Sequence, residues 1–285
     1  MAKYVVAVVG GTGAVGREML NTLDPRDFPI ESIRVMASAR SAGSTVNFRD
    51  AQIEVEDLER ADFSGVDFAL FSAGSGIAKA HAPRAAEAGA IVIDNSSAFR
   101  YEDDKPLVVP EVNPEAAFAH EGIIANPNCS TIQLVVGLKP LHDAATMQRV
   151  ICSTYQSASG AGQKGISELW NGVRARINEE AEPTPSTFPH PIAFEAIPHI
   201  DVFQESGYTR EEEKMTKETR KIMGLPKLEI SSTCVRVPVL KSHSEAVTID
   251  FENPMSADEA RRILREAPGV KVYDDTSSDT YPLAR

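Results

Sequence analysis

Cys129 is the residue of this sequence whose type and position best suit covalent chemistry. It lies in the segment Asn126-Pro-Asn-Cys129-Ser-Thr131, at the first turn of a predicted helix. The positive end of a helix dipole favours the thiolate, which is the nucleophilic form of a cysteine. Cys152 and Cys234 lie inside β-rich runs, where a cysteine is usually a small, inert hydrophobic residue. Position alone leaves Cys129 open between a nucleophile and an ordinary thiol.

A second chemical pattern is the turn Gly11-Thr-Gly13-Ala-Val-Gly16, which follows a predicted strand at 4–9 and opens a predicted helix at 14–23. Glycines at this spacing let the backbone approach a pyrophosphate, whose charge then lies at the helix N-terminus. The glycines alone fit a plain turn equally well. The strand before them and the helix after them favour a dinucleotide site.

The residues after the next predicted strand, at 32–37, indicate which dinucleotide binds. An NAD enzyme usually places Asp or Glu there to hold the ribose 2′-OH. Here the stretch is Ala37-Ser-Ala-Arg40-Ser41, with no acid and one arginine. Arg40 and the hydroxyls of Ser38 and Ser41 suit a 2′-phosphate, so we predict NADP. The alternative is that Arg40 is a solvated loop residue.

Four polar side chains lie close to predicted strands, and three of them have an ordinary alternative to a functional role. Gln156 is either a water-facing amide or a group that orients an acyl substrate. Arg236 needs a carboxylate partner, either in an internal ion pair or on a substrate. His243 is either a solvated loop residue or, near a thiol, an acid–base group. Arg100 follows a strand at 90–94, where an α/β crevice takes anions.

Glu211 and Lys214 share one face of a predicted helix. The capping box Thr209-Arg-Glu-Glu212 opens that helix, and Gly224 and Pro226 close it after about Met223. An i, i+3 pair of opposite charges is most simply a surface ion pair that contributes about 0.2–0.5 kcal/mol.

Strands and helices alternate over the first third of the chain, which indicates βαβ units and a parallel sheet. Further predicted elements there are a strand at 69–72 and a helix at 78–88. After Asn126 the pattern changes to a helix at 130–138 that stops at Pro140, β-rich runs at 149–157, 228–239 and 246–252, and a helix from Ser256 to about Glu266. We therefore predict an α/β protein with a doubly wound, Rossmann-like NADP domain at 1–127 and an α+β catalytic and dimerisation domain at 128–285. The proline-rich stretch 182–198 is expected to be an ordered excursion or a subunit contact.

Composition excludes several classes of protein. The 285 residues carry 29 Lys and Arg against 41 Asp and Glu, a net charge of −12. Such a chain is a poor general binder of nucleic acid or anionic membranes, so an anionic ligand needs local arginines and lysines. No apolar run approaches the ~20 residues of a membrane span. Three cysteines without Cys-x-x-Cys spacing argue against a disulfide framework or a thiolate zinc site and favour the reducing cytoplasm.

Six segments, in order along nearly the whole chain, resemble the aspartate-β-semialdehyde dehydrogenase family. They are Gly10-Gly-Thr-Gly13-Ala-Val-Gly16, Asp94-Asn-Ser-Ser-Ala-Phe-Arg100, Val109-Pro-Glu-Val-Asn113, Asn126 to Thr131, Gln156 to Gly162, and Arg236 through His243-Ser-Glu245. The resemblance implies NADPH-dependent reductive dephosphorylation of L-aspartyl-4-phosphate to L-aspartate 4-semialdehyde, on the route to lysine, methionine and threonine. It also implies a homodimer formed through the second domain.

The same resemblance implies residue roles. Cys129 is the nucleophile that forms a thioacyl intermediate, His243 the acid–base group and Gln156 the residue that orients the acyl group. Arg100 and Lys214 bind phosphate, and Arg236 and Glu211 bind the substrate α-carboxylate and amino group. No metal is implied. The residues implied to line the cofactor are Thr12, Gly13, Ala14, Val15, Arg40, Ser41, Ser159 and Gly160.

The chain departs from the family pattern in two places. The stretch from Phe71 to Ile77 differs slightly from the family's usual Gly-Gly-Ser form. The sequence ends at Tyr281-Pro-Leu-Ala-Arg285, whereas family members continue through further strands and a last helix that contributes to the NADP pocket. A fragment or a shortened form is therefore expected.

Three rival functions are also compatible with the sequence. N-acetyl-γ-glutamyl-phosphate reductase uses a similar fold and thiol, although its cysteine neighbourhood typically differs from Asn-Cys129-Ser-Thr. A non-catalytic NADP-binding protein would keep the fold without a reactive thiol. A Cys–His hydrolase would need no cofactor, which the turn Gly11–Gly16 argues against.

Overall fold

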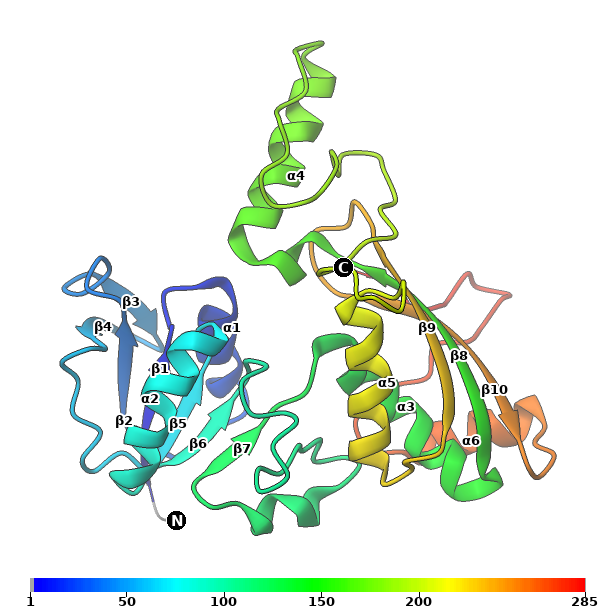
Figure 1. Cartoon of the computed structure of the whole chain (residues 1–285), viewed down its shortest axis with the longest axis horizontal. Coiled ribbons are helices and arrows are strands. Elements are labelled where there is room, and N and C mark those ends of the chain that lie inside the picture. Colours follow the sequence, from blue (N-terminus) through cyan, green and yellow to red (C-terminus); the bar gives the residue numbers. More distant parts are fainter. Residues whose placement is uncertain (1–2, 285) are drawn as a thin grey trace. The chain divides into compact units, whose positions relative to one another are not determined.

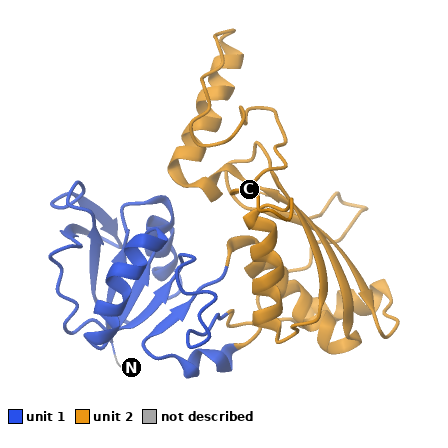
Figure 2. Cartoon of the chain, viewed as in Figure 1, with its two compact units in different colours: residues 1–108, 114–127 blue, residues 109–113, 128–285 orange. Residues whose placement is uncertain are grey.

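The structure is a computed structural model that describes residues 3–284, so Arg285, the end of the sequence, lies outside the described residues. The chain forms two compact units (Figure 2). Unit 1 comprises Met1–Val108 and Pro114–Pro127, and unit 2 comprises Val109–Asn113 and Asn128–Arg285. The long segments of the two units therefore meet at Pro127 and Asn128, while the short segment Val109–Asn113 belongs to unit 2.

Unit 1 is built on a seven-stranded sheet in the order β3-β4-β2-β1-β5-β6-β7 (Figure 1). All pairs are parallel except the β3–β4 hairpin. The strands are β1 Tyr4–Val9, β2 Ile30–Ala37, β3 Thr45–Phe48, β4 Ala51–Asp57, β5 Phe68–Phe71, β6 Ile91–Asp94 and β7 Ile123–Ala125. The helices are α1 Ala14–Leu23, α2 Ser75–Glu87 and the 3-10 helix η1 Pro114–Ala119. This is the predicted doubly wound α/β architecture.

The centre of the sheet is buried because its strands are continuous apolar runs. Val6, Val8 and Val9 of β1 are at most 1% exposed, as expected for a strand covered on both faces. The chain moves from β1 to β2 on one side and later to β5 on the other side of β1. Such a reversal opens a crevice at the carboxyl ends of the strands, which is where open α/β sheets bind ligands.

Unit 2 is built on a three-stranded sheet in the order β10-β8-β9. Strand β8 (Met147–Gln156) pairs parallel with β9 (Glu229–Arg236) and antiparallel with β10 (Ser244–Phe251). The helices are α3 Cys129–Ala145, α4 Gly162–Ile177, α5 Arg210–Met223 and α6 Ala257–Glu266, with a short 3-10 helix η2 Ala158–Ala161. Figure 1 shows α3 and α5 over one face of this sheet. Their core includes Leu134, Leu138, Val150, Cys152, Met215 and Cys234.

Most predicted elements form close to their expected bounds, and the capping box of Thr209 and Glu212 at the start of α5 is present. The predicted stop at Pro140 is wrong, because α3 continues to Ala145. A proline inside a helix removes one backbone hydrogen bond. Here burial of Leu134, Leu138 and Ala145 on the inner side of α3 compensates for that loss. Helix α4 and strands β3, β4 and β7 were not predicted from the sequence.

The proline-rich stretch after α4 is an ordered excursion. Phe188, Ile192, Ala193 and Ile197 are buried in one apolar cluster with Leu169 of α4. Glu168 of α4 also accepts hydrogen bonds from the backbone of residues 186–188. This segment therefore gains its order from packing against α4 rather than from regular secondary structure.

The glycine turn after β1 is shaped by close packing. Gly10 has φ +81°, a conformation that favours glycine. A Cβ atom on Gly16 would lie 2.4 Å from the Gly10 carbonyl oxygen and 2.6 Å from the Gly11 Cα, both backbone atoms. Gly16 thus lets α1 pack directly on the turn.

Gly16→Ala should lower the free energy of unfolding by about 1–3 kcal/mol, because the backbone of the turn must move to admit the methyl group. Gly76→Ala is a matched control inside α2, since among the described residues a Cβ there meets no atom within 4 Å beyond its chain neighbours and its own helix backbone. The control should be neutral or stabilising by up to about 1 kcal/mol. Denaturant unfolding measures both changes, and equal stability of the two variants would contradict the packing argument.

Candidate active site

Cys129 is the first residue of α3, and its side chain is exposed. The preceding residue, Asn128, is the N-cap of the helix. Its Oδ1 accepts hydrogen bonds from the backbone N–H groups of Ser130 (3.0 Å) and Thr131 (3.2 Å). The capped helix end therefore holds the thiol at the positive end of the helix dipole.

His243 is the direct partner of the thiol. Its Nε2 lies 3.2 Å from Cys129 Sγ. The backbone N–H of Ser157 donates to its Nδ1 at 3.0 Å, so the ring proton of the neutral imidazole lies on Nε2, facing the sulfur. Burial, reinforced by the charge of Arg236, lowers the pKa of His243. A neutral imidazole of this tautomer donates a hydrogen bond to a thiolate.

The other two cysteines lie in the core of unit 2. Cys152 and Cys234 are at most 1% exposed. Burial raises the pKa of both thiols, that of Cys234 to about 12. Cys129 is thus the exposed thiol at a helix N-terminus, whereas the other two free cysteines are buried.

Gln156 and Glu211 form a buried polar network behind the thiol. Gln156 Nε2 donates to Glu211 Oε1 at 3.0 Å, and Asn128 Nδ2 donates to the same oxygen at 2.9 Å. Although burial acts to raise the pKa of Glu211, the charge of Lys214 and these hydrogen bonds lower it overall. Glu211 is therefore a carboxylate at neutral pH.

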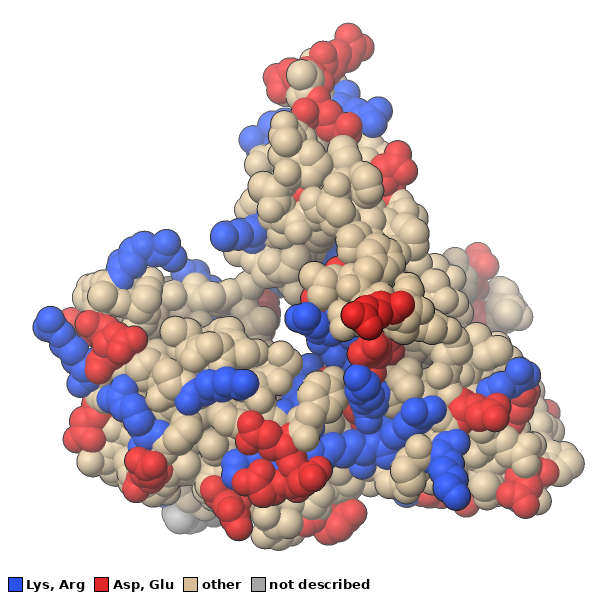
Figure 3. Space-filling model, in the orientation of Figure 1, with Lys and Arg blue, Asp and Glu red and all other residues tan. Residues whose placement is uncertain are grey.

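Lys214 is held between two carboxylates. Its Nζ lies 2.7 Å from Asp201 Oδ2 and 3.2 Å from Glu211 Oε2. Glu211 is 5% exposed, so the simple reading of this pair as a surface ion pair is wrong. Burial acts to lower the pKa of Lys214, but the two carboxylates raise it overall. Lys and Arg side chains along α5 are prominent on the face shown in Figure 3, in a chain that is acidic as a whole.

Arg236, the last residue of β9, lies against the loop that carries Ser159 and Gly160. One guanidinium nitrogen donates to the Ser157 carbonyl at 2.7 Å, and burial lowers the pKa of the guanidinium. A Cβ on Gly160 would lie 2.7 Å from Arg236 and 3.4 Å from the His243 ring. The Ser159 hydroxyl contacts that of Ser157 at 2.9 Å. Glycine at position 160 therefore allows the loop to approach both side chains.

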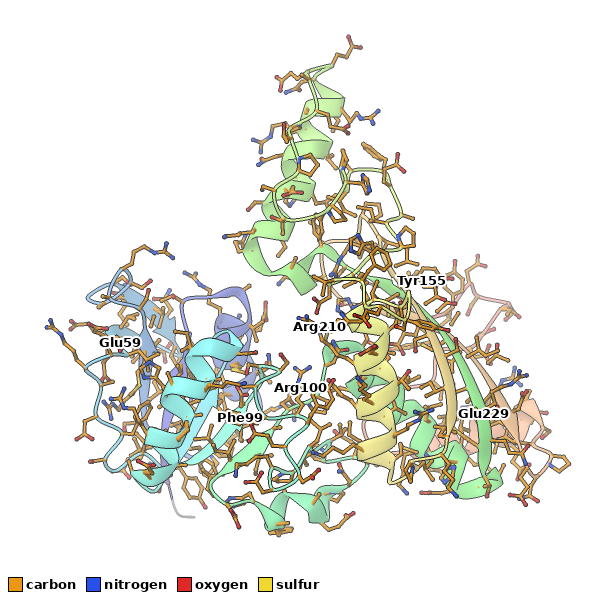
Figure 4. All side chains as sticks on the ribbon, in the orientation of Figure 1. Glu59, Phe99, Arg100, Tyr155, Arg210 and Glu229 are labelled. Atoms are coloured by element: carbon orange, nitrogen blue, oxygen red, sulfur yellow. The ribbon has the colours of Figure 1, made fainter. Side chains whose placement is uncertain are left out.

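Arg100 lies in unit 1, beyond the carboxyl end of β6 (Figure 4). It is 6% exposed and donates to the carbonyl oxygens of Asn126 (2.9 Å) and Asn95 (3.0 Å). These contacts hold the guanidinium at the edge of the sheet where an α/β crevice binds anions.

The predicted dinucleotide turn is also in unit 1 and fits a pyrophosphate. Gly13 is the N-cap of α1, which has no side-chain cap and no acidic residue in its first turn. Its N-terminal N–H groups are thus available to an anion, with Thr12, Ala14 and Val15 beside them. Arg40 is exposed in the turn after β2, where the Ser41 N–H bonds the Ser38 carbonyl.

The predicted residues therefore fall into two groups. Unit 2 carries the pair Cys129 and His243 and the network of Gln156, Glu211 and Lys214, which Glu211 connects to Asn128, the residue before Cys129. Arg236, Ser159 and Gly160 lie beside His243. Unit 1 carries Arg100, the turn from Thr12 to Val15, Arg40 and Ser41. Within residues 3–284 we find no cluster of three or more His, Cys, Asp or Glu suited to a metal, and no helix long and apolar enough to cross a membrane.

Several site residues were not singled out from the sequence. Asn128 carries a readable signal, since an asparagine directly before a helix is a preferred N-cap. Glu218 shares the helical face of Glu211 at i+7, which the spacing could have indicated. Asp201 and Ser157 carry no local signal, because long-range folding alone brings them to Lys214 and His243.

Comparison with known protein families identifies the class of enzyme that this chain resembles. The model of the semialdehyde dehydrogenase NAD binding domain matches residues 5–120, and that of the semialdehyde dehydrogenase dimerisation domain matches residues 138–285. An aspartate-semialdehyde dehydrogenase of Legionella pneumophila is 52% identical over 98% of this chain and 81% of its own length. The Bacillus subtilis enzyme of the same name is 48% identical over 98% of this chain and 82% of its own length.

A solved structure from the same family supports this classification. The crystal structure of aspartate semialdehyde dehydrogenase II complexed with ASA, from Vibrio cholerae, superposes with a TM-score of 0.93 at 45% identity and covers 98% of this chain and 85% of that chain. The chain belongs to the aspartate-semialdehyde dehydrogenase family.

Glu245, two residues beyond His243, is a partly exposed residue with one buried carboxyl oxygen. It lies on β10 opposite Thr154 of β8. Its Oε1 is buried without a hydrogen-bond partner among the described residues. Burial raises the pKa of Glu245 to about 7, against hydrogen bonds with Gln133 and Cys152 that act to lower it. Burial therefore favours the protonated side chain.

Glu245→Gln should stabilise the protein at alkaline pH. The native state binds the Glu245 proton up to about pH 7, whereas the unfolded chain releases it near 4.5. Wild-type stability thus falls as pH rises between these values, at about 1.4 kcal/mol per unit, and the variant escapes a loss of about 3 kcal/mol. Urea unfolding at pH 5 and pH 8 measures the difference. A stability difference that does not change with pH would contradict it.

Proposed function

We propose that this chain catalyses the NADPH-dependent reductive dephosphorylation of L-aspartyl-4-phosphate to L-aspartate 4-semialdehyde, in the biosynthesis of lysine (with diaminopimelate), methionine and threonine. The observation that carries the proposal is the 3.2 Å contact between Cys129 Sγ and His243 Nε2 at the N-terminus of α3. An acyl phosphate is reduced most readily after transfer to a soft nucleophile, because the thioester is reactive and phosphate is a good leaving group.

In the first step, Cys129 Sγ attacks the acyl carbon of the substrate. The new C–S bond forms as the C–O bond to phosphate breaks, which releases inorganic phosphate and leaves a thioacyl enzyme. His243 stabilises the thiolate through its Nε2 proton and supplies or recovers a proton at that atom in later steps. Gln156, fixed by its bond to Glu211, orients the acyl group.

Charged side chains select the substrate. Arg236 binds the substrate α-carboxylate, and the carboxylate of Glu211 binds the α-amino group. Arg100 and Lys214 bind the phosphate. Because Lys214 is paired with Asp201 and Glu211, phosphate must compete with these carboxylates for its ammonium group.

NADP is the proposed cofactor, and when bound as NADPH it supplies the hydride for the reduction. The proposed NADP-binding domain is 1–127, and the proposed catalytic and dimerisation domain is 128–285. The α1 N-terminus with Thr12, Gly13, Ala14 and Val15 suits the pyrophosphate, and Arg40 with Ser41 suits the 2′-phosphate. Ser159 and Gly160 are the remaining residues proposed to line the cofactor. A family member from Candida albicans has been solved with NADP, at 25% identity and a TM-score of 0.70.

A homodimer is the proposed assembly, formed through the outer face of the unit 2 sheet. Ile151 and Tyr155 of β8 are 43% and 46% exposed on the face opposite the core. The strand register places uncharged residues opposite them: Ser231 and Thr248 opposite Ile151, and Val235 and Ser244 opposite Tyr155. Charged side chains on this face lie at one end only, where Arg149 has Asp250 and Glu229 as its strand partners. An uncharged patch with exposed large apolar side chains is typical of a surface that another copy covers. We place the enzyme in the cytoplasm, which suits three free cysteines.

The activity should appear as reduction of NADP⁺ that requires both L-aspartate semialdehyde and inorganic phosphate. Cys129→Ser should lower kcat at least about 1000-fold, because a hydroxyl is a far weaker nucleophile than a thiolate, while NADPH affinity stays within about twofold. Absorbance at 340 nm and cofactor fluorescence measure the two properties. Full activity of Cys129→Ser would overturn the assignment; preference for N-acetyl-γ-glutamate semialdehyde would favour the neighbouring reductase.

Ile151→Asp should convert the dimer to a monomer, because each copy would bring a carboxylate into the uncharged patch around Ile151 and Tyr155. We expect the dimer dissociation constant to rise about 100-fold or more. Phe118→Asp is the matched control, because Phe118 is 89% exposed and belongs to unit 1, not to the sheet of unit 2. Sedimentation velocity distinguishes the species, and an unchanged dimer in Ile151→Asp would exclude this face.

A further inference from the structure

We propose that Glu218 is a positioning residue for Cys129. Its carboxyl group fixes the backbone of Asn128 and so sets the direction in which the neighbouring thiol points. The inference rests on the proposed function, since it assigns the thiol a catalytic role, and it concerns a residue that takes no part in substrate or cofactor binding as described above.

The central observation is a hydrogen bond between distant segments. The backbone N–H of Asn128 donates to Glu218 Oε2 at 2.6 Å, across 90 residues of sequence. Glu218 is fully buried, at 0% exposure, in the middle of α5. A carboxyl group in such a place loses its hydration, so its retention there requires bonded partners. Asn128 is one such partner.

Asn128 is held by α5 at two points. The backbone N–H of Asn128 donates to Glu218, and the side-chain Nδ2 of Asn128 donates to Glu211 Oε1 at 2.9 Å. Between these two residues on the same helical face, the sulfur of Met215 contacts Thr131 Oγ1 at 3.8 Å. Glu211, Met215 and Glu218, at positions i, i+4 and i+7 of α5, thus contact the N-cap and the first turn of α3.

These hydrogen bonds affect the thiol because Asn128 directly precedes the nucleophile Cys129. Asn128 is extended, with ψ 144°, and its Oδ1 must stay over the N–H groups of Ser130 and Thr131 to cap the helix. The orientation of the Asn128 peptide decides where the Cα–Cβ bond of Cys129 points. Loss of the Glu218 acceptor leaves a buried N–H without its partner, and the peptide then rotates to find another. Cys129 Sγ would move away from His243 Nε2.

The test compares Glu218→Ala with Glu218→Gln. Both variants remove the same acidic group, but the glutamine oxygen can still accept the Asn128 N–H. The difference between them therefore isolates the hydrogen bond from the charge. Glu213→Gln is a matched control on α5, because Glu213 pairs with Lys217 at the surface.

Two readouts address the thiol directly. The first is kcat and KM for L-aspartate semialdehyde; the second is the pH profile of iodoacetamide alkylation, which reports Cys129 because Cys152 and Cys234 are buried. We expect kcat of Glu218→Ala to be about 10–100-fold below that of Glu218→Gln, with KM within about threefold, as for a misplaced reacting atom. The alkylation midpoint should lie at higher pH in Glu218→Ala than in Glu218→Gln.

Equal kcat and equal alkylation profiles in the two variants, with only their melting temperatures different, would show a purely structural role and overturn the proposal. If Glu218→Ala fails to fold, Glu218→Asp replaces it, since the shorter side chain withdraws the carboxyl from Asn128 while keeping its acidic character. Glu218→Asp should then show the same kcat defect relative to Glu218→Gln, and its absence would overturn the proposal. Wild-type protein without dehydrogenase activity would refute the proposed function instead, and alkylation would still test Glu218.

Discussion

The contact between Cys129 Sγ and His243 Nε2 is the interaction on which the chemistry of this protein depends. It joins two segments 114 residues apart, so neither segment can form the site alone. The thiol side of the contact is set by the capped start of α3. The imidazole side is set by the Ser157 N–H, which leaves the ring proton on Nε2. The Asn128 side-chain cap and the Ser157 backbone donor therefore decide whether the pair can react.

The surroundings of this pair show how an acidic chain handles anionic substrates. Glu211 and Asp201 hold Lys214, while Arg236 lies buried beside the Ser157 carbonyl. Buried charges are tolerated because each has partners, and breaking one pair leaves the other group uncompensated. The same network restrains Asn128 and Gln156, so substrate recognition and thiol positioning share residues. Substitutions within it should consequently be non-additive.

The sequence predicted much of unit 1 because its signals are local. Continuous apolar runs such as β1 read as buried strands, and the turn Gly11–Gly16 read as a strand-to-helix connection at its correct place. Sequence-based predictions failed where tertiary packing overrides local secondary-structure propensity. Helix α3 continues through Pro140, and the short strand β7 gains its order by pairing with its neighbour β6. Helix α4, which contains glycines, depends on the apolar cluster around Leu169 and Phe188.

The sequence by itself determined the residue types of the site and the local elements that carry them, including Cys129 at a helix start and Arg100 beyond a strand. Local spacing could not assign a functional role to Glu211, Lys214 or Arg236. It favoured a surface ion pair for the first two, and it left an internal ion pair open for Arg236. Only the tertiary structure decided that Glu211 is buried against Gln156 and Asn128, and that Glu218 reaches the backbone beside the nucleophile. The physical reason is distance along the chain: burial, desolvation and hydrogen bonding between segments exist only after the chain has folded.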